Sequence, residues 1–159
     1  MNVPATSDEF RRRLHEPFRP RRGRRVATVV GIGAGLLFLG VALVAPGSGP
    51  GAFSPVDRIG IIVVGATIGW FLSRWALVVA LPSESGLTVR NLFNQRHLEW
   101  PEVVAVRFGG GGPWATLDLA DGESLPVLAI QRADGLWAGE EVGRLATLVA
   151  RHSPTVADD

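Results

Sequence analysis

The sequence predicts a two-helix transmembrane hairpin followed by a small α+β domain, in which a bent antiparallel sheet or open barrel is capped by a C-terminal helix. Three observations support this fold class. Two long apolar runs lie in the first half of the chain, short alternating segments fill most of the second half, and an amphipathic helical pattern follows them. The 159 residues leave room for one ordinary domain with appendages, and 47% hydrophobic residues is high for a wholly soluble protein.

The first apolar run covers residues 26–45 and contains no charged residue. As a helix it would be about 30 Å long, which matches the hydrocarbon core of a bilayer. We therefore expect a transmembrane helix over 26–45, followed by a Gly/Pro/Ser-rich extracytoplasmic loop over 46–57. A cleaved signal peptide is the alternative. The apolar core of a signal peptide is only about 7–15 residues long, whereas this run has twenty residues and is followed by a second apolar run.

The second apolar run begins at Ile59 and continues past Arg74, its only charge. A helix that extended well beyond Arg74 would hold this charge in hydrocarbon, at a cost of about 2.5–3.5 kcal/mol. If the helix ends near Trp75, the guanidinium meets headgroups, and Trp70 and Trp75 lie close to a membrane interface, which aromatic rings favour. We expect the second transmembrane helix over 58–75.

Glycine pairs occur in both runs at the spacing that lets helix backbones approach closely. Gly31 and Gly35 lie in the first helix, and Gly65 and Gly69 lie in the second. Counted from the basic ends of the two helices, the pairs have similar depths, so we expect them to pack against each other in an antiparallel hairpin. Contact between two copies of the chain is the competing use, and glycine is also common in membrane helices generally.

The distribution of arginine predicts the orientation of the hairpin. Residues 1–25 form a basic arm with eight Arg against three acids, whereas the loop between the helices offers Arg58 alone. Basic residues are retained on the cytoplasmic side. We therefore expect a multi-pass protein of the plasma membrane with both termini in the cytoplasm.

The basic arm could instead serve nucleic-acid binding. Residues 82–159, however, carry six Arg against eleven acids, whereas a nucleic-acid arm usually adjoins a basic domain. The sequence therefore predicts no nucleic-acid partner. Clustered Arg beside a span is instead expected to be drawn to anionic lipid, at about 1 kcal/mol per residue.

No pattern of residues predicts catalysis, a cofactor or a metal ion. The chain has no cysteine, which excludes disulfides and thiol chemistry. The glycine run at 109–112 leads into an alternating strand rather than the helix that a phosphate loop requires. The three histidines lie in different segments with no second ligand at metal spacing, namely His15, His97 and His152.

The second half of the chain alternates between apolar and polar residues in six or seven short segments. The segment WATLDLADGESLPVLAI predicts a hairpin around Asp121-Gly122, with Pro126 on an edge strand or at a bulge. A closing amphipathic helix is predicted in which Ala138, Val142, Leu145 and Val149 share one face. Glu140 and Glu141 lie in its first turn, and Arg151 and His152 lie in its last turn, as the helix dipole favours.

These segments resemble the bacterial pleckstrin-homology-like (PH-like) domains of small actinobacterial membrane proteins of the low-molecular-weight protein antigen type. The resemblance rests on Gly86–Asn91, Trp100–Val103 and Leu117–Gly122, and covers roughly residues 76–152, which leaves 153–159 as a tail. It implies a PH-like fold and a membrane-anchored layout, and it implies no ligand.

The sequence thus predicts a non-catalytic, membrane-anchored cytoplasmic module that binds or scaffolds an unidentified protein. The alternative is a sensor of anionic lipid headgroups at the inner leaflet, for which Arg90 and Arg96 are the cations nearest the acidic turn PSESG. Trp114, beside the glycine loop, is the aromatic residue expected at a partner contact together with these arginines. Besides the lipid bilayer and the protein partner, a homo-oligomer is possible.

Overall fold

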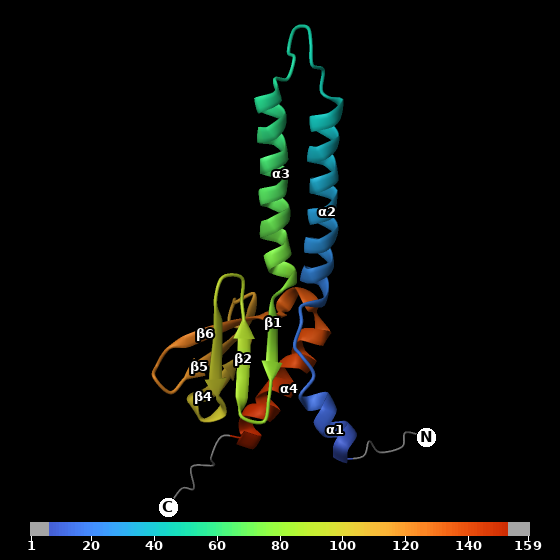
Figure 1. Cartoon of the computed structure of the whole chain (residues 1–159). Coiled ribbons are helices and arrows are strands. Elements are labelled where there is room, and N and C mark those ends of the chain that lie inside the picture. The colour runs from blue at the N-terminus through green and yellow to red at the C-terminus, as the bar shows by residue number, and fades with distance from the viewer. Residues whose placement is uncertain (1–6, 153–159) are drawn as a thin grey trace, which may run out of the picture. The chain divides into compact units, whose positions relative to one another are not determined.

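The computed structural model describes residues 7–152 and divides into two compact units (Figure 1). One unit, Gly23–Leu77, holds most of a helical hairpin. The other combines Met1–Arg22 with Val78–Asp159 and holds the sheets. The tail predicted over 153–159 and the first six residues of the predicted arm lie outside the described residues.

The hairpin consists of α2 (Arg21–Val44) and α3 (Pro55–Ala76), both long and apolar enough to cross a membrane. Both helices begin earlier than predicted. In α2 the arginine-rich stretch before Val26 is itself helical, because arginine is a good helix former. In α3, Ser54 and Asp57 form a capping box and Pro55 occupies the first turn, so the helix begins inside the predicted loop.

Arg58 binds the C-terminal end of α2. Its guanidinium donates hydrogen bonds to the carbonyl oxygens of Ala42 and of Ala45, the latter at 2.5 Å. These carbonyls lie in the last turn of α2 and directly after it, where the helix leaves acceptors without partners and where the helix dipole favours a cation. The charge at this end of the hairpin therefore has a structural use.

The four glycines of the hairpin have unequal surroundings. A Cβ built on Gly65 would lie 2.6 Å from the Cβ of Phe38, and one on Gly31 would lie 3.5 Å from the Cβ of Leu72. Nothing lies within 4 Å of a Cβ built on Gly35 or Gly69. The close approach of α2 and α3 that was expected at all four glycines is thus seen at two of them, Gly65 and Gly31, one from each pair.

The other unit contains two three-stranded antiparallel sheets and a C-terminal helix, which confirms the predicted fold class. The first sheet has the order β1-β2-β3 and the second β4-β5-β6, so Pro126 lies on an edge strand. The elements are β1 (Val79–Pro82), β2 (Gly86–Arg90), β3 (Gln95–Glu99), η1 (Trp100–Glu102), β4 (Val103–Arg107), β5 (Trp114–Leu119), β6 (Ser124–Gln131), η2 (Arg132–Asp134) and α4 (Leu136–His152).

The core lies between the sheets and α4, which packs against β4 and β6. Leu145 and Leu148 of α4 are fully buried, as are Leu87 and Leu117 from the two sheets. Burying a leucine side chain stabilises a fold by about 1.5–3 kcal/mol before opposing entropic terms are considered. The alternating burial along β5 explains why the sequence pattern predicted this strand correctly.

The structure corrects the prediction of a separate basic arm. Residues 7–22 belong to the same unit as the sheets, and α1 (Ser7–Leu14) packs against α4. Phe18 is fully buried, and its backbone exchanges two hydrogen bonds with Ala80 of β1, at 2.8 and 3.0 Å. The N-terminal segment, residues 7–22, is therefore packed in the same unit as the PH-like sheets and α4.

Arg144 of α4 also binds this N-terminal segment. Its guanidinium donates to the carbonyl oxygens of Arg13, Leu14 and Glu16 at 3.0, 3.1 and 2.6 Å. It also pairs with Glu141 at 2.6 Å and lies 3.7 Å from the centroid of the Phe18 ring. One arginine thus satisfies the carbonyls at which α1 ends and covers the aromatic ring that follows.

Candidate functional site

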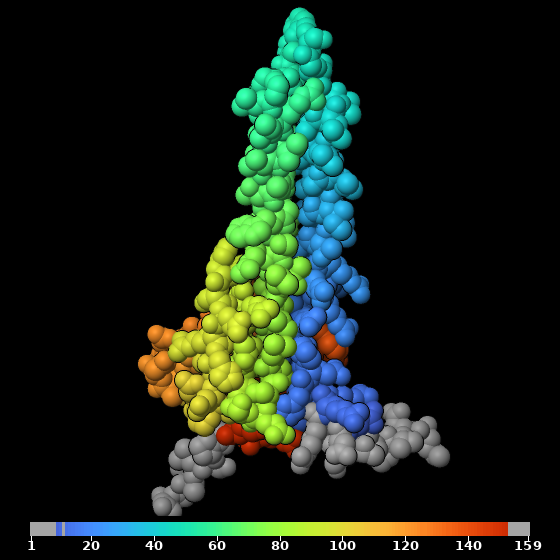
Figure 2. Space-filling model, viewed as in Figure 1, coloured from blue at the N-terminus to red at the C-terminus, as the bar shows by residue number. Residues whose placement is uncertain are grey.

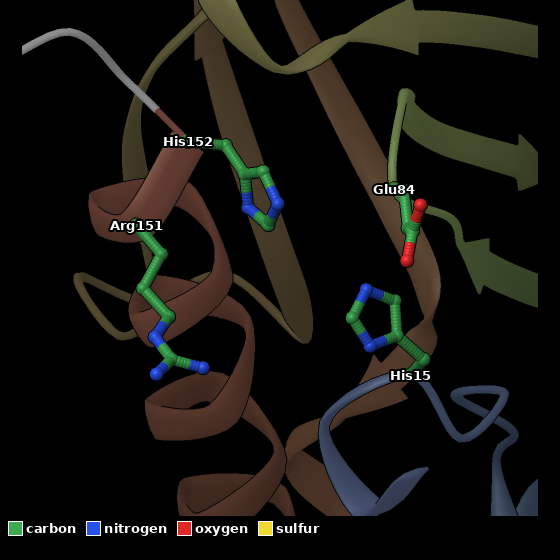
Figure 3. Close-up of a pocket in the computed structure, with 4 residues that line it drawn as sticks. All are labelled: His15, Glu84, Arg151 and His152. Atoms are coloured by element: carbon green, nitrogen blue, oxygen red, sulfur yellow. The ribbon is translucent and has the colours of Figure 1, made fainter. Parts of the chain in front are cut away.

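A cavity of about 460 Å³ lies on the sheet-containing unit between segments that are far apart in the sequence (Figure 3). His15 comes from the segment after α1, Glu84 from the turn between β1 and β2, and Arg151 and His152 from the last turn of α4. In Figure 3 the His15 ring and the Glu84 carboxylate face each other, and the His152 ring faces the same space.

His152 is held by a stack and a hydrogen bond. Its ring lies 5.1 Å from the Trp100 ring at an interplanar angle of 17°, and its Nδ1 lies 2.9 Å from the carbonyl oxygen of Leu148. Because a carbonyl only accepts, Nδ1 is the donor of this bond. In the neutral ring Nε2 is then an acceptor, and in the charged ring it becomes a second donor.

Trp100 also fixes the turn that carries Glu84. Its indole Nε1 donates to the carbonyl oxygen of Ser83 at 3.0 Å, while its ring is buried in the core. The hydroxyl of Ser83 accepts from the backbone nitrogen of Gly86 at 3.1 Å, which closes the turn. Trp100 therefore contacts both the turn that carries Glu84 and the ring of His152, two parts of the cavity lining.

The lining groups suit binding of a polar or anionic group. Arg151 supplies guanidinium donors, the two histidines supply ring nitrogens, and Glu84 supplies one carboxylate. The Arg151 guanidinium lies 5.4 Å from the Phe10 ring, so this arginine has an aromatic contact beside the cavity. Among residues 7–152, no three His, Cys, Asp or Glu side chains come together in a way that could hold a metal ion.

The residues predicted from the sequence as partner contacts do not line this cavity. Arg90 is exposed and donates to the Gln95 side chain at 3.1 Å, while Trp114 is half-buried and packs against the core. Arg96 donates to Glu123 at 2.5 Å and to Asp121 at 3.3 Å. The hydrogen bond with Glu123 is the main reason that the pKa of Arg96 is raised above its ordinary value.

The two arginines also lie on opposite faces of their sheet. Val89 pairs with Arg96, and the next pair is Arg90 with Gln95. Because successive side chains of a strand alternate between faces, Arg90 and Arg96 point away from each other. They are therefore poorly placed to hold one headgroup between them.

Sequence reasoning missed the cavity because it joins the two ends of the chain. His15 was assigned to the basic arm and His152 to a helix end, and only the fold brings both to one cavity. One signal was present in the sequence, since Phe18 stands between two prolines in an otherwise polar stretch. An aromatic residue in that setting indicates packing against a core.

Comparison with known proteins agrees with this architecture. The profile described as Bacterial PH domain matches residues 83–147. The chain is 35% identical over 115 residues to the uncharacterized protein Rv1417 of Mycobacterium tuberculosis and to the uncharacterized protein Mb1452 of Mycobacterium bovis, covering 72% of this chain and 75% of each relative. No solved structure matches the chain significantly. Residues 83–147 therefore form a domain of the bacterial PH domain family, and the chain belongs to the same family as these uncharacterized mycobacterial proteins.

Proposed function

We propose that the chain is a plasma-membrane protein in which two transmembrane helices anchor a non-catalytic PH-like domain that binds or scaffolds a protein in the cytoplasm. The finer resemblance to the low-molecular-weight protein antigen type is part of this proposal. The observation that carries it is the exposed apolar surface of α2 and α3. Figure 2 shows the side chains of these helices forming the surface of the hairpin.

In the apolar 18-residue stretch of each helix, only 11% of the residues of α2 and 6% of those of α3 are buried. Large side chains such as Leu36, Leu37 and Val63 are more than half exposed. A contiguous apolar surface of this kind is rare on soluble monomers and marks a membrane or partner contact. A bilayer covers such a surface without any further protein.

The proposed orientation of the hairpin in the membrane rests on the distribution of arginine between its two ends. Arg21, Arg22, Arg24 and Arg25 precede the apolar part of α2, whereas Arg58 at the opposite end is engaged with helix carbonyls. Basic residues close to a span are retained in the cytoplasm. This supports cytoplasmic N- and C-termini and an extracytoplasmic loop.

Single cysteines in this cysteine-free chain test the topology. A cysteine at Ser48 in the loop is expected to react with an impermeant thiol reagent added to intact cells, and a cysteine at Ser124 in β6 is expected to stay unlabelled. After the cells are lysed, both positions should react, which controls for accessibility. Labelling of Ser124→Cys in intact cells would reverse the orientation.

We place partner binding at the cavity of His15, Glu84, Arg151 and His152. Its donors suit an acidic side chain or a chain-terminal carboxylate of the partner. The alternative, headgroup sensing through Arg90 and Arg96, is disfavoured because Arg96 is already paired with Glu123 and the two arginines face opposite sides of their sheet.

Crosslinking at the rim of the cavity tests this assignment. Ser85→Cys carries a thiol-linked photocrosslinker beside Glu84, in membranes of the native host. We expect a protein adduct of one defined mass that Arg151→Ala weakens, because that substitution removes a guanidinium from the cavity. Arg90→Ala is the matched control and should leave the adduct unchanged.

A label at Val104→Cys on β4 should not give the same adduct. Identical adducts from both positions, or no effect of Arg151→Ala, would contradict binding at the cavity. An adduct with a second copy of the chain would identify a homo-oligomer, and an adduct with lipid would favour the headgroup sensor.

A further inference from the structure

One end of the sheet-containing unit combines arginine, tryptophan and an exposed leucine. We name this surface the junction face and define it as Arg21, Arg22, Arg132, Leu136 and Trp137. It surrounds the point at which the chain enters α2. Its residues come from three segments, the start of α2, η2 and the start of α4.

Hydrogen bonds join these segments closely. The carboxylate of Asp134 is buried and accepts from the backbone nitrogens of Arg21 and Arg22 at 3.1 and 2.8 Å. It thereby satisfies two of the donors that a helix leaves unpaired at its start. The side chain of Arg22 donates to the carbonyl oxygen of Ala133 at 3.1 Å, and the Arg21 guanidinium lies 3.4 Å from the centroid of the Trp137 ring.

Chain continuity brings this surface near lipid if α2 spans the membrane, and the inference rests on the proposed function in that respect. The apolar run of α2 begins at Val26. At 1.5 Å per residue along a helix, Arg22 lies about 6 Å from Val26. The groups bonded to Arg21 and Arg22 must then lie within the headgroup region or just beside it.

The side chains of the junction face suit that position. Leu136 is 92% exposed, the highest exposure of any large apolar side chain described in residues 7–152. Trp137 is half-buried beneath Arg21, and tryptophan with arginine is the combination found at membrane interfaces. A leucine alone on a surface needs no explanation, but here it adjoins residues bonded to the start of a span.

A second tryptophan lies at the same end. Trp114 pairs with Gln131 at the close of β6, and the carbonyl oxygen of Pro113 accepts from the Arg132 nitrogen at 2.8 Å. The contact expected at Trp114 from the sequence therefore has a candidate in the bilayer surface.

The distribution of charge on the domain also favours an orientation in which the junction face lies toward the membrane. The turn between β5 and β6 carries Asp121 and Glu123, and it lies at the opposite end of β5 from Trp114. At about 3.3 Å per residue, the six residues of β5 separate the two ends by about 17–20 Å. Both carboxylates pair with Arg96, which leaves one negative charge in excess at this turn. An anionic leaflet therefore attracts the arginines of the junction face and repels the turn between β5 and β6.

We propose that the junction face rests on the inner leaflet, with Leu136 inserted at the boundary between headgroups and acyl chains. The contact holds the PH-like domain in one orientation at the bilayer. In that orientation the turn between β5 and β6 points away from the surface. It is a second attachment to the membrane in addition to the spans.

The full chain with single cysteines tests this contact. Leu136→Cys, Ser124→Cys at the opposite end of the β5–β6 hairpin, and Leu36→Cys in the exposed face of α2 each carry an environment-sensitive fluorophore. The proteins are reconstituted into vesicles of phosphatidylcholine and phosphatidylglycerol, with or without brominated acyl chains. Leu136 is exposed, so its replacement removes no core contact.

We expect brominated lipid to quench the labels at positions 36 and 136 and to leave the label at 124 unquenched. Quenching at 36 without quenching at 136 overturns the junction contact and leaves the span intact. Equal quenching at 136 and 124 also overturns it, because the domain then has no preferred orientation. Absence of quenching at 36 contradicts the proposed membrane anchor itself.

Discussion

Replacing Phe18 with alanine is expected to lower the free energy of unfolding of the PH-like domain by about 3–5 kcal/mol, the usual cost of removing a buried phenylalanine side chain. Phe18 is fully buried although it lies in an arginine-rich segment, and its backbone pairs with Ala80. The substitution leaves a cavity beneath Arg144, whose guanidinium covers the ring. Urea denaturation of the full chain, followed by tryptophan fluorescence, measures the change.

Phe10→Ala is the matched control for this substitution. Phe10 lies in α1 of the same segment but is 47% exposed, so its loss should change the free energy of unfolding by about 0.5 kcal/mol or less. If both variants lose the same stability, the segment contributes to the domain without Phe18 being part of the core. If neither loses stability, the N-terminal segment is not part of the domain.

The predicted strands and closing helix depended on local periodicity, and this is why they could be found from the sequence. In β5, alternate residues from Ala115 to Leu119 are buried, and α4 buries Leu145, Leu148 and Val149 on one face. A two-residue or 3.6-residue period is visible in any short window. The two apolar helices were found for a similar reason, since length and lack of charge are local properties.

The N-terminal segment could not be assigned in this way. The six arginines of residues 7–22 dominate any average over the segment, whereas its role depends on a single pair of backbone hydrogen bonds between Phe18 and Ala80. A bridge of one residue has no period, and its partner lies more than sixty positions away. The candidate cavity was missed for the same reason, because His15 reaches it only through this bridge.

The expected partner contacts also depended on information that the sequence does not contain. Arg96 was expected at a partner contact because it is one of the two cations nearest the turn PSESG, but Glu123 reaches it from the other sheet. Side-chain pairs between sheets are set by how the sheets pack. Local patterns therefore predicted which elements form, and the fold decided which charged groups remain available.

Gly86→Ala is expected to destabilise the domain by about 3 kcal/mol, the upper end of the usual cost of overpacking a tight site. Gly86 begins β2 and pairs with Glu99 of β3. A Cβ at this position would overlap the carbonyl oxygen of Leu98 and lie 3.1 Å from the Cα of Glu99. Because both atoms are backbone, relief requires the two strands to separate rather than a side chain to rotate.

That separation would expose Leu87 and Leu98, which are both fully buried, and would loosen the turn that carries Glu84. The expected result is a lower urea midpoint together with weaker crosslinking from the rim of the cavity.

Gly139→Ala in α4 provides a control of opposite sign. A Cβ there has no neighbour within 4 Å, and alanine is a better helix former than glycine by about 0.5–1 kcal/mol, so this variant should be slightly more stable than the parent. Equal midpoints for the two glycine variants would mean that the close approach of β2 and β3 at Gly86 is not what holds the turn in place.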